Sequence, residues 1–150
     1  MRTDGAKTMT WAFDTNVLVY CHDPRDTRKQ AIARALLRQG AATAAAKLPW
    51  QVLAEFGGIG ARPLRPDGMR LFTPAALLTE LDALSGQFEV LYPDADVLQL
   101  ALRGAALYQL PWLDAVVWAH AERYGCEELY SEDFQHGRRY GAVKVVNPFA

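Results

Sequence analysis

The chain has 150 residues, of which 51% are hydrophobic and 22% are charged, and its formal net charge is −1. This composition is typical of a soluble globular protein, and the near-zero net charge argues against binding nucleic acid through bulk positive charge. No stretch approaches the roughly 18 uninterrupted apolar residues of a membrane span, and the first residues lack the apolar region of a signal peptide. Cys21 and Cys126 have neither metal-site spacing nor the density of a disulfide scaffold, which favours a reducing, cytoplasmic setting.

The chain begins with a polar segment that is followed by a short apolar strand. Residues 1–9 are predicted to be frayed, and residues 10–150 are predicted to form one domain. Residues 11–13 have the apolar character of a buried strand, and Asp14 stands where this strand ends and a short helix over about 16–21 begins. An Asp-Thr-Asn triplet is also a common helix N-cap, so by itself it requires no chemistry.

The next part of the chain predicts a helix, a strand and a second helix. The first helix covers residues 27–39 with Gly40 as its stop, and the strand covers residues 41–46. The second helix starts near Pro49, and its apolar residues surround Glu55. Three glycines soon after this glutamate predict a weakened helix, because each costs about 1 kcal/mol relative to alanine.

Helices and strands continue to alternate in the second half. The predicted helices cover about residues 73–84, 94–107 and 113–124. The predicted strands cover residues 88–91, 129–130 and 143–146. This alternation predicts an α/β fold with a mainly parallel central sheet flanked by helices, and it contains no internal repeat.

Four acids stand out by their placement, namely Asp14, Glu55, Asp114 and Asp133. Two of them end predicted strands, one lies in the first turn of a helix, and Glu55 lies among apolar helical residues. Strand ends and helix starts gather at the same edge of a parallel sheet, so we expect these carboxylates to share one cleft. Two like charges about 4 Å apart repel by on the order of 4 kcal/mol at an effective dielectric of 20, so the cluster requires bound protons or a cation.

The chemistry of these ligands predicts the kind of cation. Hard carboxylate oxygens without histidine or thiolate partners favour Mg²⁺ or Mn²⁺ over zinc. Such ions activate water, and two of them roughly 4 Å apart stabilise the attacking and leaving oxygens of a phosphodiester. The acids therefore indicate metal-dependent hydrolysis of a phosphodiester bond.

The sequence resembles a known family, the PIN domains. The motifs that carry the resemblance are residues 13–18, the helical Glu55, residues 113–116, residues 131–137 and residues 141–149. The closing segment is similar to the end of many PIN-domain proteins in the VapC-like toxin group. The resemblance covers almost the whole chain, from about residue 10 to 149, and the order of the motifs together with the matching acids makes it specific.

The resemblance implies a compact α/β/α domain related to the 5′-nucleases that acts as a Mg²⁺- or Mn²⁺-dependent ribonuclease. It implies that Asp14 and Asp114 are the principal metal ligands and that Glu55 and Asp133 complete the acidic site. Glu132 is an alternative to Asp133 as the nearer carboxylate, since neighbouring residues on a strand point to opposite faces, but the family position favours Asp133.

Supporting residues and partners follow from the same resemblance. Thr15 or Asn16 is expected to position the first carboxylate or a metal-bound water. The expected partners are an RNA substrate, a small antitoxin whose terminal peptide lies in the active-site groove, and a second copy of the chain in a homodimer. Basic residues are scattered, and the candidates for RNA phosphate contacts, set against a plain surface role, are Arg62, Arg65, Arg138 and Arg139.

Several other side chains have simpler interpretations than chemistry. His120 lies within an apolar helix, which favours a core position, and His136 lies in a turn, which favours a structural role. Trp112 and Trp118 could stack on a base, but core packing or a dimer interface is the more common use of such aromatic side chains.

Two alternative functions remain open from the sequence. The first is a PIN-like interaction or scaffold module without nuclease activity, which the presence of all four acids argues against. The second is a phosphatase or receiver-like domain with Asp14 as the phosphate acceptor. A phosphatase of the haloacid-dehalogenase type needs a second aspartate where Asn16 stands, and Lys144 is a poor match to the lysine of a receiver.

Overall fold

The fold is built on a six-stranded sheet in a computed structural model that describes residues 9–150. The expected frayed start therefore lies, except for its last residue, outside the described residues. Within them the strand order is β3-β2-β1-β4-β6-β5, and only β5 runs antiparallel to its neighbour. The strands are β1 (Trp11–Phe13), β2 (Ala46–Pro49), β3 (Glu89–Leu91), β4 (Glu128–Tyr130), β5 (Arg139–Tyr140) and β6 (Val143–Val146).

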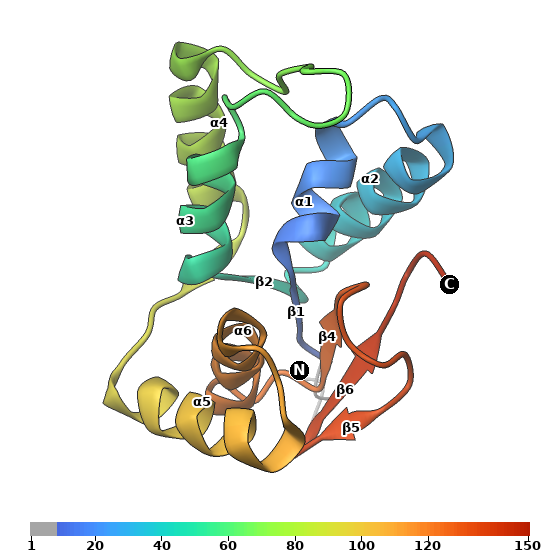
Figure 1. Ribbon diagram of the computed structural model, residues 1–150. Helices are drawn as coiled ribbons and strands as arrows, with labels where there is room; N and C mark the ends of the chain where they lie inside the picture. Colours follow the sequence, from blue (N-terminus) through green and yellow to red (C-terminus); the bar gives the residue numbers. More distant parts are fainter. Residues whose placement is uncertain (1–8) are drawn as a thin grey trace, which may run out of the picture.

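Six helices in the described part of the chain cover the sheet (Figure 1). Helices α1 and α2 lie on one side of the strands, α5 and α6 pack together on the other, and α3 and α4 stand side by side beyond β2. Their bounds are α1 (Thr15–His22), α2 (Thr27–Ala42), α3 (Trp50–Ile59), α4 (Pro74–Gln87), α5 (Ala95–Tyr108) and α6 (Trp112–Arg123). The predicted α/β class with a mainly parallel sheet between helices is confirmed. None of these helices is long and apolar enough to span a membrane.

The hydrophobic core surrounds the central strand β1, which is buried along its whole length. The side chains of Phe13, Leu48 and Leu129 come from three adjacent strands and are fully inaccessible to solvent. Parallel strands with helices on both faces are buried on both faces, which explains why β1 is an apolar run and not an alternating pattern. The strand predicted over residues 143–146 has the same bounds in the structure.

The predicted end of the helix over residues 27–39 was wrong, and so was the strand predicted over residues 41–46. Gly40 lies inside α2, which continues to Ala42, and β2 begins only at Ala46. A Cβ atom on Gly40 would lie 2.5 Å from the Ala46 Cβ atom and 2.6 Å from the indole ring of Trp11. This glycine therefore permits α2 to approach the sheet closely, and the chain turns after it at Ala44, whose φ is 58°.

Other predicted boundaries also shifted. Helix α4 continues through the Ser-Gly pair at 85–86 to Gln87, and α3 continues through Gly57 to Ile59. Packing compensates for the glycine, because Gly57 lies next to the Leu81 side chain of α4. The short edge strand β5 was not predicted, since only two residues form it and they pair with β6 across a tight turn.

Candidate metal centre

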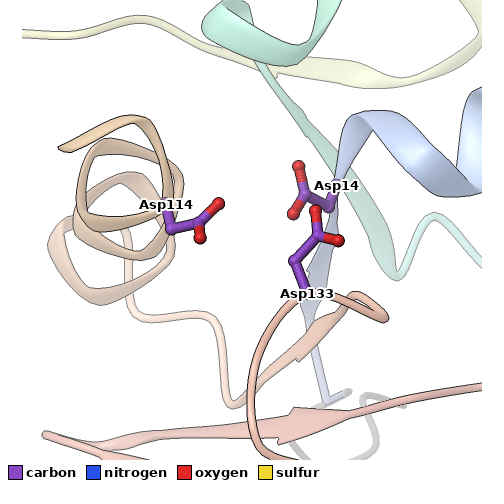
Figure 2. Close-up of side chains that lie close together, drawn as sticks. All are labelled: Asp14, Asp114 and Asp133. Atoms are coloured by element: carbon purple, nitrogen blue, oxygen red, sulfur yellow. The ribbon is translucent and has the colours of Figure 1, made fainter. Parts of the chain in front are cut away.

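Two of the four acids leave the sheet at the same edge because their strands are parallel neighbours. Phe13 pairs with Tyr130, so the residues that follow β1 and β4 emerge side by side. The Asp14 N–H donates a hydrogen bond of 2.9 Å to the Tyr130 carbonyl, and Asp133 follows in the loop after β4. Asp114 lies in the first turn of α6, whose start faces the same edge (Figure 2).

Three aspartates form a compact acidic cluster. Asp14, Asp114 and Asp133 each place one carboxylate oxygen within 4.8 Å of the others. Figure 2 shows the three carboxylates converging from the start of α1, from α6 and from the loop after β4. Asp14 is only 4% exposed, Asp114 is half-buried and Asp133 is exposed, so the cluster extends from the core to the surface.

Burial and mutual repulsion raise the pKa values of two aspartates in the cluster. The pKa of Asp14 is raised to about 7, mainly by burial and also by the charges of Asp133 and Asp114, against two hydrogen bonds that lower it. Burial also raises the pKa of Asp114, as do the charges of Asp133 and Glu55. Among the described residues these three carboxylates form no ion pair with a basic side chain, and a cation would stabilise their ionised forms.

Glu55 lies beside the cluster and is not one of its three converging carboxylates. Its carboxylate accepts hydrogen bonds from the Thr15 hydroxyl at 2.6 Å and from the Gln51 amide at 3.3 Å. Its charge nevertheless acts on Asp114, whose pKa it raises. The structure therefore brings three of the four predicted acids together and places the fourth at the border of the cluster.

The polar residues after β1 have distinct contacts. Asp14 is the N-cap of α1, and its side chain accepts a hydrogen bond of 2.7 Å from the Thr15 N–H. The Asn16 amide donates to the Asp133 carboxylate at 3.0 Å. The N-cap interpretation of this triplet is therefore correct, and the same aspartate also belongs to the acidic cluster.

Ser131 and Gln51 hold the site together and were not predicted. The buried Ser131 hydroxyl donates to the Asp14 carboxylate at 2.8 Å and accepts from the Asp133 N–H at 3.1 Å. The Gln51 amide donates to the Leu113 carbonyl at 3.1 Å and so connects α3 to the start of α6. A polar residue at the end of a buried strand, two positions before a candidate ligand, is the signal in the sequence that could have indicated Ser131.

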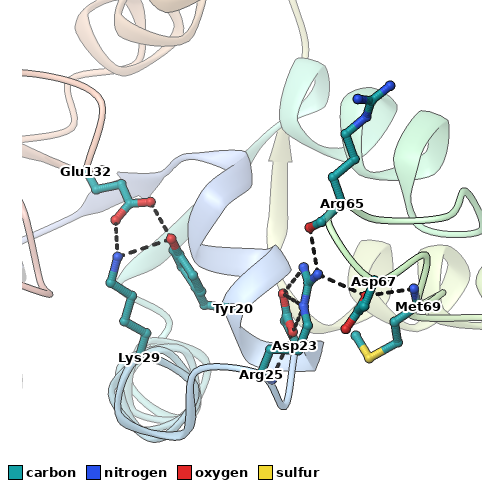
Figure 3. A network of polar contacts seen from close by, with 8 residues as sticks. All are labelled: Tyr20, Asp23, Arg25, Lys29, Arg65, Asp67, Met69 and Glu132. Atoms are coloured by element: carbon teal, nitrogen blue, oxygen red, sulfur yellow. Dashed lines mark hydrogen bonds and ion pairs between the residues drawn. The ribbon is translucent and has the colours of Figure 1, made fainter.

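The alternative that placed Glu132 in the cluster was wrong. Its carboxylate accepts hydrogen bonds from Tyr20 at 2.7 Å and from Lys29 at 2.9 Å (Figure 3). Both contacts direct it to helices α1 and α2. Asp133 is the member of this pair that faces the other aspartates.

The residues at this edge fit a hard divalent cation. The three converging ligands are all carboxylate oxygens, which Mg²⁺ and Mn²⁺ prefer. Two amide oxygens beside them, Asn16 Oδ1 and Gln51 Oε1, are buried without a hydrogen-bond partner in the described part of the chain. Their amide nitrogens contact the carboxylates of Asp133 and Glu55, so both amides belong to the same site. Such acceptors suit the water molecules that Mg²⁺ retains.

The four arginines considered for phosphate contacts are all exposed. Arg62 and Arg65 lie on the loop between α3 and α4, and Arg139 lies on the edge strand β5. The guanidinium of Arg138 lies 4.5 Å from the ring centre of Tyr140. The structure leaves their contacts with RNA as a hypothesis.

The histidines and tryptophans are placed mostly as expected. His120 is 1% exposed and its Nδ1 lies 2.8 Å from the Val116 carbonyl, while His136 Nδ1 accepts a hydrogen bond from a backbone N–H. Trp118 is buried and donates to the Tyr140 carbonyl. Trp112 is 46% exposed, which excludes core packing and leaves the expected dimer interface as a prediction.

Comparison with known proteins identifies the family. The PIN domain family matches residues 12–141, which includes the strand ends and the helix start that carry the acidic cluster. The chain belongs to the PIN domain family. None of the curated proteins compared with it matches significantly.

Solved structures of other proteins share this fold at low sequence identity. DNA-bound VapBC from Salmonella typhimurium superposes with a TM-score of 0.66 at 14% identity, covering 92% of this chain and 97% of that one. FitAcB from Neisseria gonorrhoeae superposes with a TM-score of 0.63 at 19% identity, covering 93% of this chain and 99% of that one. VapC20 from Mycobacterium tuberculosis is described as a toxin that cleaves the sarcin-ricin loop. It superposes with a TM-score of 0.59 at 19% identity, covering 83% of this chain and 90% of that one.

Proposed function

We propose that this PIN domain, taken as residues 10–150, is a Mg²⁺- or Mn²⁺-dependent endoribonuclease. The observation that carries the proposal is the convergence of three carboxylates, one of them buried, at the edge of a parallel sheet. A cluster in which one carboxylate is buried and two have raised pKa values lowers stability unless a cation binds to it, so a function that uses the cation would explain its presence.

Asp14, Asp114 and Asp133 are the residues that would hold the ion. When bound, a divalent ion supplies Lewis-acid polarisation of a phosphodiester and activation of water. The surrounding side chains orient the ligands, since Ser131 donates to Asp14 and Asn16 donates to Asp133. Hydrogen-bonding partners of this kind fix the ligand geometry and are needed for full metal affinity.

The biological role is proposed from the solved relatives. A structure from Klebsiella pneumoniae that superposes on this chain is described as a toxin–antitoxin complex, and VapC20 is described as a toxin that cleaves the sarcin-ricin loop. We propose accordingly that this chain is the toxin of such a module in the cytoplasm. RNA is its substrate, a small antitoxin is its inhibitor, and a second copy of the chain completes a homodimer.

The test is RNA cleavage by purified protein that is free of bound partner. We expect a mixed RNA pool to be cut with Mn²⁺ or Mg²⁺ and to remain intact with chelator, and sequencing of the new ends then identifies the preferred site. Asp14→Asn and Asp114→Asn should each lower cleavage by a factor of about 100, because each removes one of three charged ligands. Asp82→Asn, at an exposed position of α4, is the matched control and should cleave as the wild type does.

Absence of cleavage with every metal, from protein shown to be folded by circular dichroism, would contradict the proposal. The chain would then be assigned as a PIN-domain interaction module. Cleavage that persists in chelator or in Asp14→Asn would contradict the metal-dependent mechanism and leave the ribonuclease activity in place.

A further inference from the structure

Two neighbouring acids in the loop after β4 contact successive turns of helix α1. Asp133 accepts a hydrogen bond from Asn16, and Glu132 accepts one from Tyr20. Residues four positions apart on a helix lie on the same face, so both contacts come from one face of α1. A displacement of Glu132 is passed to Asp133 through the single peptide unit between them.

Glu132 is held at both carboxylate oxygens. Tyr20 donates its hydroxyl to Oε1 at 2.7 Å, and Lys29 Nζ donates to Oε2 at 2.9 Å. Lys29 also donates to the Tyr20 hydroxyl at 3.1 Å, which closes a triangle of three polar contacts (Figure 3). The side chains of Lys29 and Glu132 are only 25% and 23% exposed, so the ion pair is shielded from water more than a surface pair is.

Aromatic side chains fix the position of the lysine. Its Nζ lies 4.6 Å from the ring centre of Tyr20 and 5.5 Å from that of Phe149. These two rings pack edge to face at 4.9 Å, and Arg28 holds the Phe149 carbonyl at 2.9 Å. The long lysine side chain is therefore ordered before any ligand binds, which reduces the entropy cost of holding Glu132.

We infer that Lys29 and Tyr20 are positioning residues that act on the acidic cluster through Glu132. By holding Glu132, they keep Asp133 within reach of the other two aspartates. Asn16 and Ser131 already form hydrogen bonds with Asp133. Support through Glu132 matters for Asp133 because it is exposed and lies on a loop, while Asp14 and Asp114 belong to helix starts. Neither Lys29 nor Tyr20 belongs to the cluster itself. The inference rests on the proposed function, since it assigns cation binding to the three aspartates.

The first test measures Mn²⁺ affinity of the full chain by isothermal titration calorimetry, without RNA. Lys29→Met removes the ammonium and keeps an apolar side chain of similar length, and we expect it to weaken Mn²⁺ binding about tenfold. Lys29→Arg keeps the charge and the hydrogen bond to Glu132, and it should bind within about threefold of the wild type. Lys47→Met is the matched control, because Lys47 forms an ion pair of the same 2.9 Å length with Glu89, away from the cluster.

The second test separates positioning from substrate binding. Lys29→Met should lower kcat for RNA cleavage about tenfold and leave KM within about twofold, because Lys29 acts on a metal ligand and not on RNA. Tyr20→Phe removes one hydrogen bond to Glu132 and retains the ion pair, so it should weaken Mn²⁺ binding by a smaller factor, about threefold. This milder variant keeps the inference testable if Lys29→Met does not fold.

Two results would overturn the inference and leave the proposed function standing. One is wild-type Mn²⁺ affinity in folded Lys29→Met and Tyr20→Phe. The other is unchanged Mn²⁺ affinity with a raised KM in Lys29→Met, which would show that Lys29 contacts the RNA. If the wild-type protein itself binds no Mn²⁺, both this inference and the metal-dependent function are rejected.

Discussion

Asp14 has two roles that make opposite demands on its charge. As the N-cap of α1 it accepts a hydrogen bond from a backbone N–H, which stabilises the helix. As a buried member of the acidic cluster it is costly to ionise, and its pKa is raised to about 7. This conflict is typical of functional residues, which give up stability for activity.

The raised pKa of Asp14 predicts how the stability of the metal-free protein depends on pH. Below about pH 4 the carboxyl is protonated in both the folded and the unfolded state. As pH rises from 4 to 7 the unfolded state ionises first, so the free energy of unfolding falls by up to about 4 kcal/mol and stays low above pH 7. Asp14→Asn should therefore stabilise the metal-free protein at pH 8 and not at pH 4.

Urea unfolding of both proteins in chelator, at pH 4 and pH 8, measures this difference. An equal effect of the substitution at the two pH values would show that folding does not raise the pKa of Asp14. Addition of Mn²⁺ at pH 8 should stabilise the wild type and not the variant.

At the scale of elements, the close approach of α2 to the sheet depends on a residue without a side chain. Gly40 faces Trp11 of β1 and Ala46 of β2 at distances that leave no room for a Cβ atom. The position of α2 matters for the site, because α2 carries Lys29 and supports α1.

Gly40→Ala should destabilise the protein although alanine is the better helix former. The added methyl group would displace the indole ring or the helix, and overpacking of this kind costs about 1–3 kcal/mol, more than the gain in helix propensity. Gly86→Ala in α4 is the control, because nothing lies within 4 Å of its added Cβ atom. We expect it to stabilise by up to about 1 kcal/mol. Thermal unfolding of both variants gives the comparison, and a stabilised Gly40→Ala would contradict the described packing.

At the scale of the whole molecule, a polar network joins the end of α1 to the loop between α3 and α4 (Figure 3). Arg25 pairs with Asp23 at 2.8 Å, donates to the Arg65 carbonyl at 2.7 Å and pairs with Asp67 at 3.2 Å. Its hydrogen bonds lower the pKa of Asp23, so these contacts persist at neutral pH and weaken only in acid. The network orders a loop that has no strand or helix of its own.

Arg25→Met should release this loop without unfolding the domain. We expect faster amide hydrogen exchange over residues 64–69 and nearly unchanged exchange in β1 and β4, because the contacts of Arg25 lie at the end of α1 and in the loop and not in these strands. Exchange followed by mass spectrometry measures both regions at once. Unchanged exchange in the loop would show that its own turns, and not Arg25, hold it in place.

The sequence by itself determined the class of the fold and most of the elements, and it predicted a type of chemistry that stays a proposal. Apolar runs alternating with helical patterns indicate strands and helices directly, because burial of one face selects the residues of each element. Asp14 follows a buried strand and Asp114 lies in a helix start. These positions predicted that both acids lie at the same edge of the sheet, because strand ends and helix starts gather there in a parallel sheet. The resemblance of the motifs to PIN domains was confirmed by the family match.

Only the tertiary structure decided which polar side chains meet. It separated Asp133 from Glu132, placed Glu55 beside the cluster, and revealed Ser131 and Gln51 as hydrogen-bond partners. It also showed that Gly40 serves packing and does not end a helix. These outcomes depend on contacts between residues that are far apart in the chain. Local patterns of apolar and polar residues do not indicate such contacts. The sequence states which groups are available, and the packing of the helices on the sheet decides their distances.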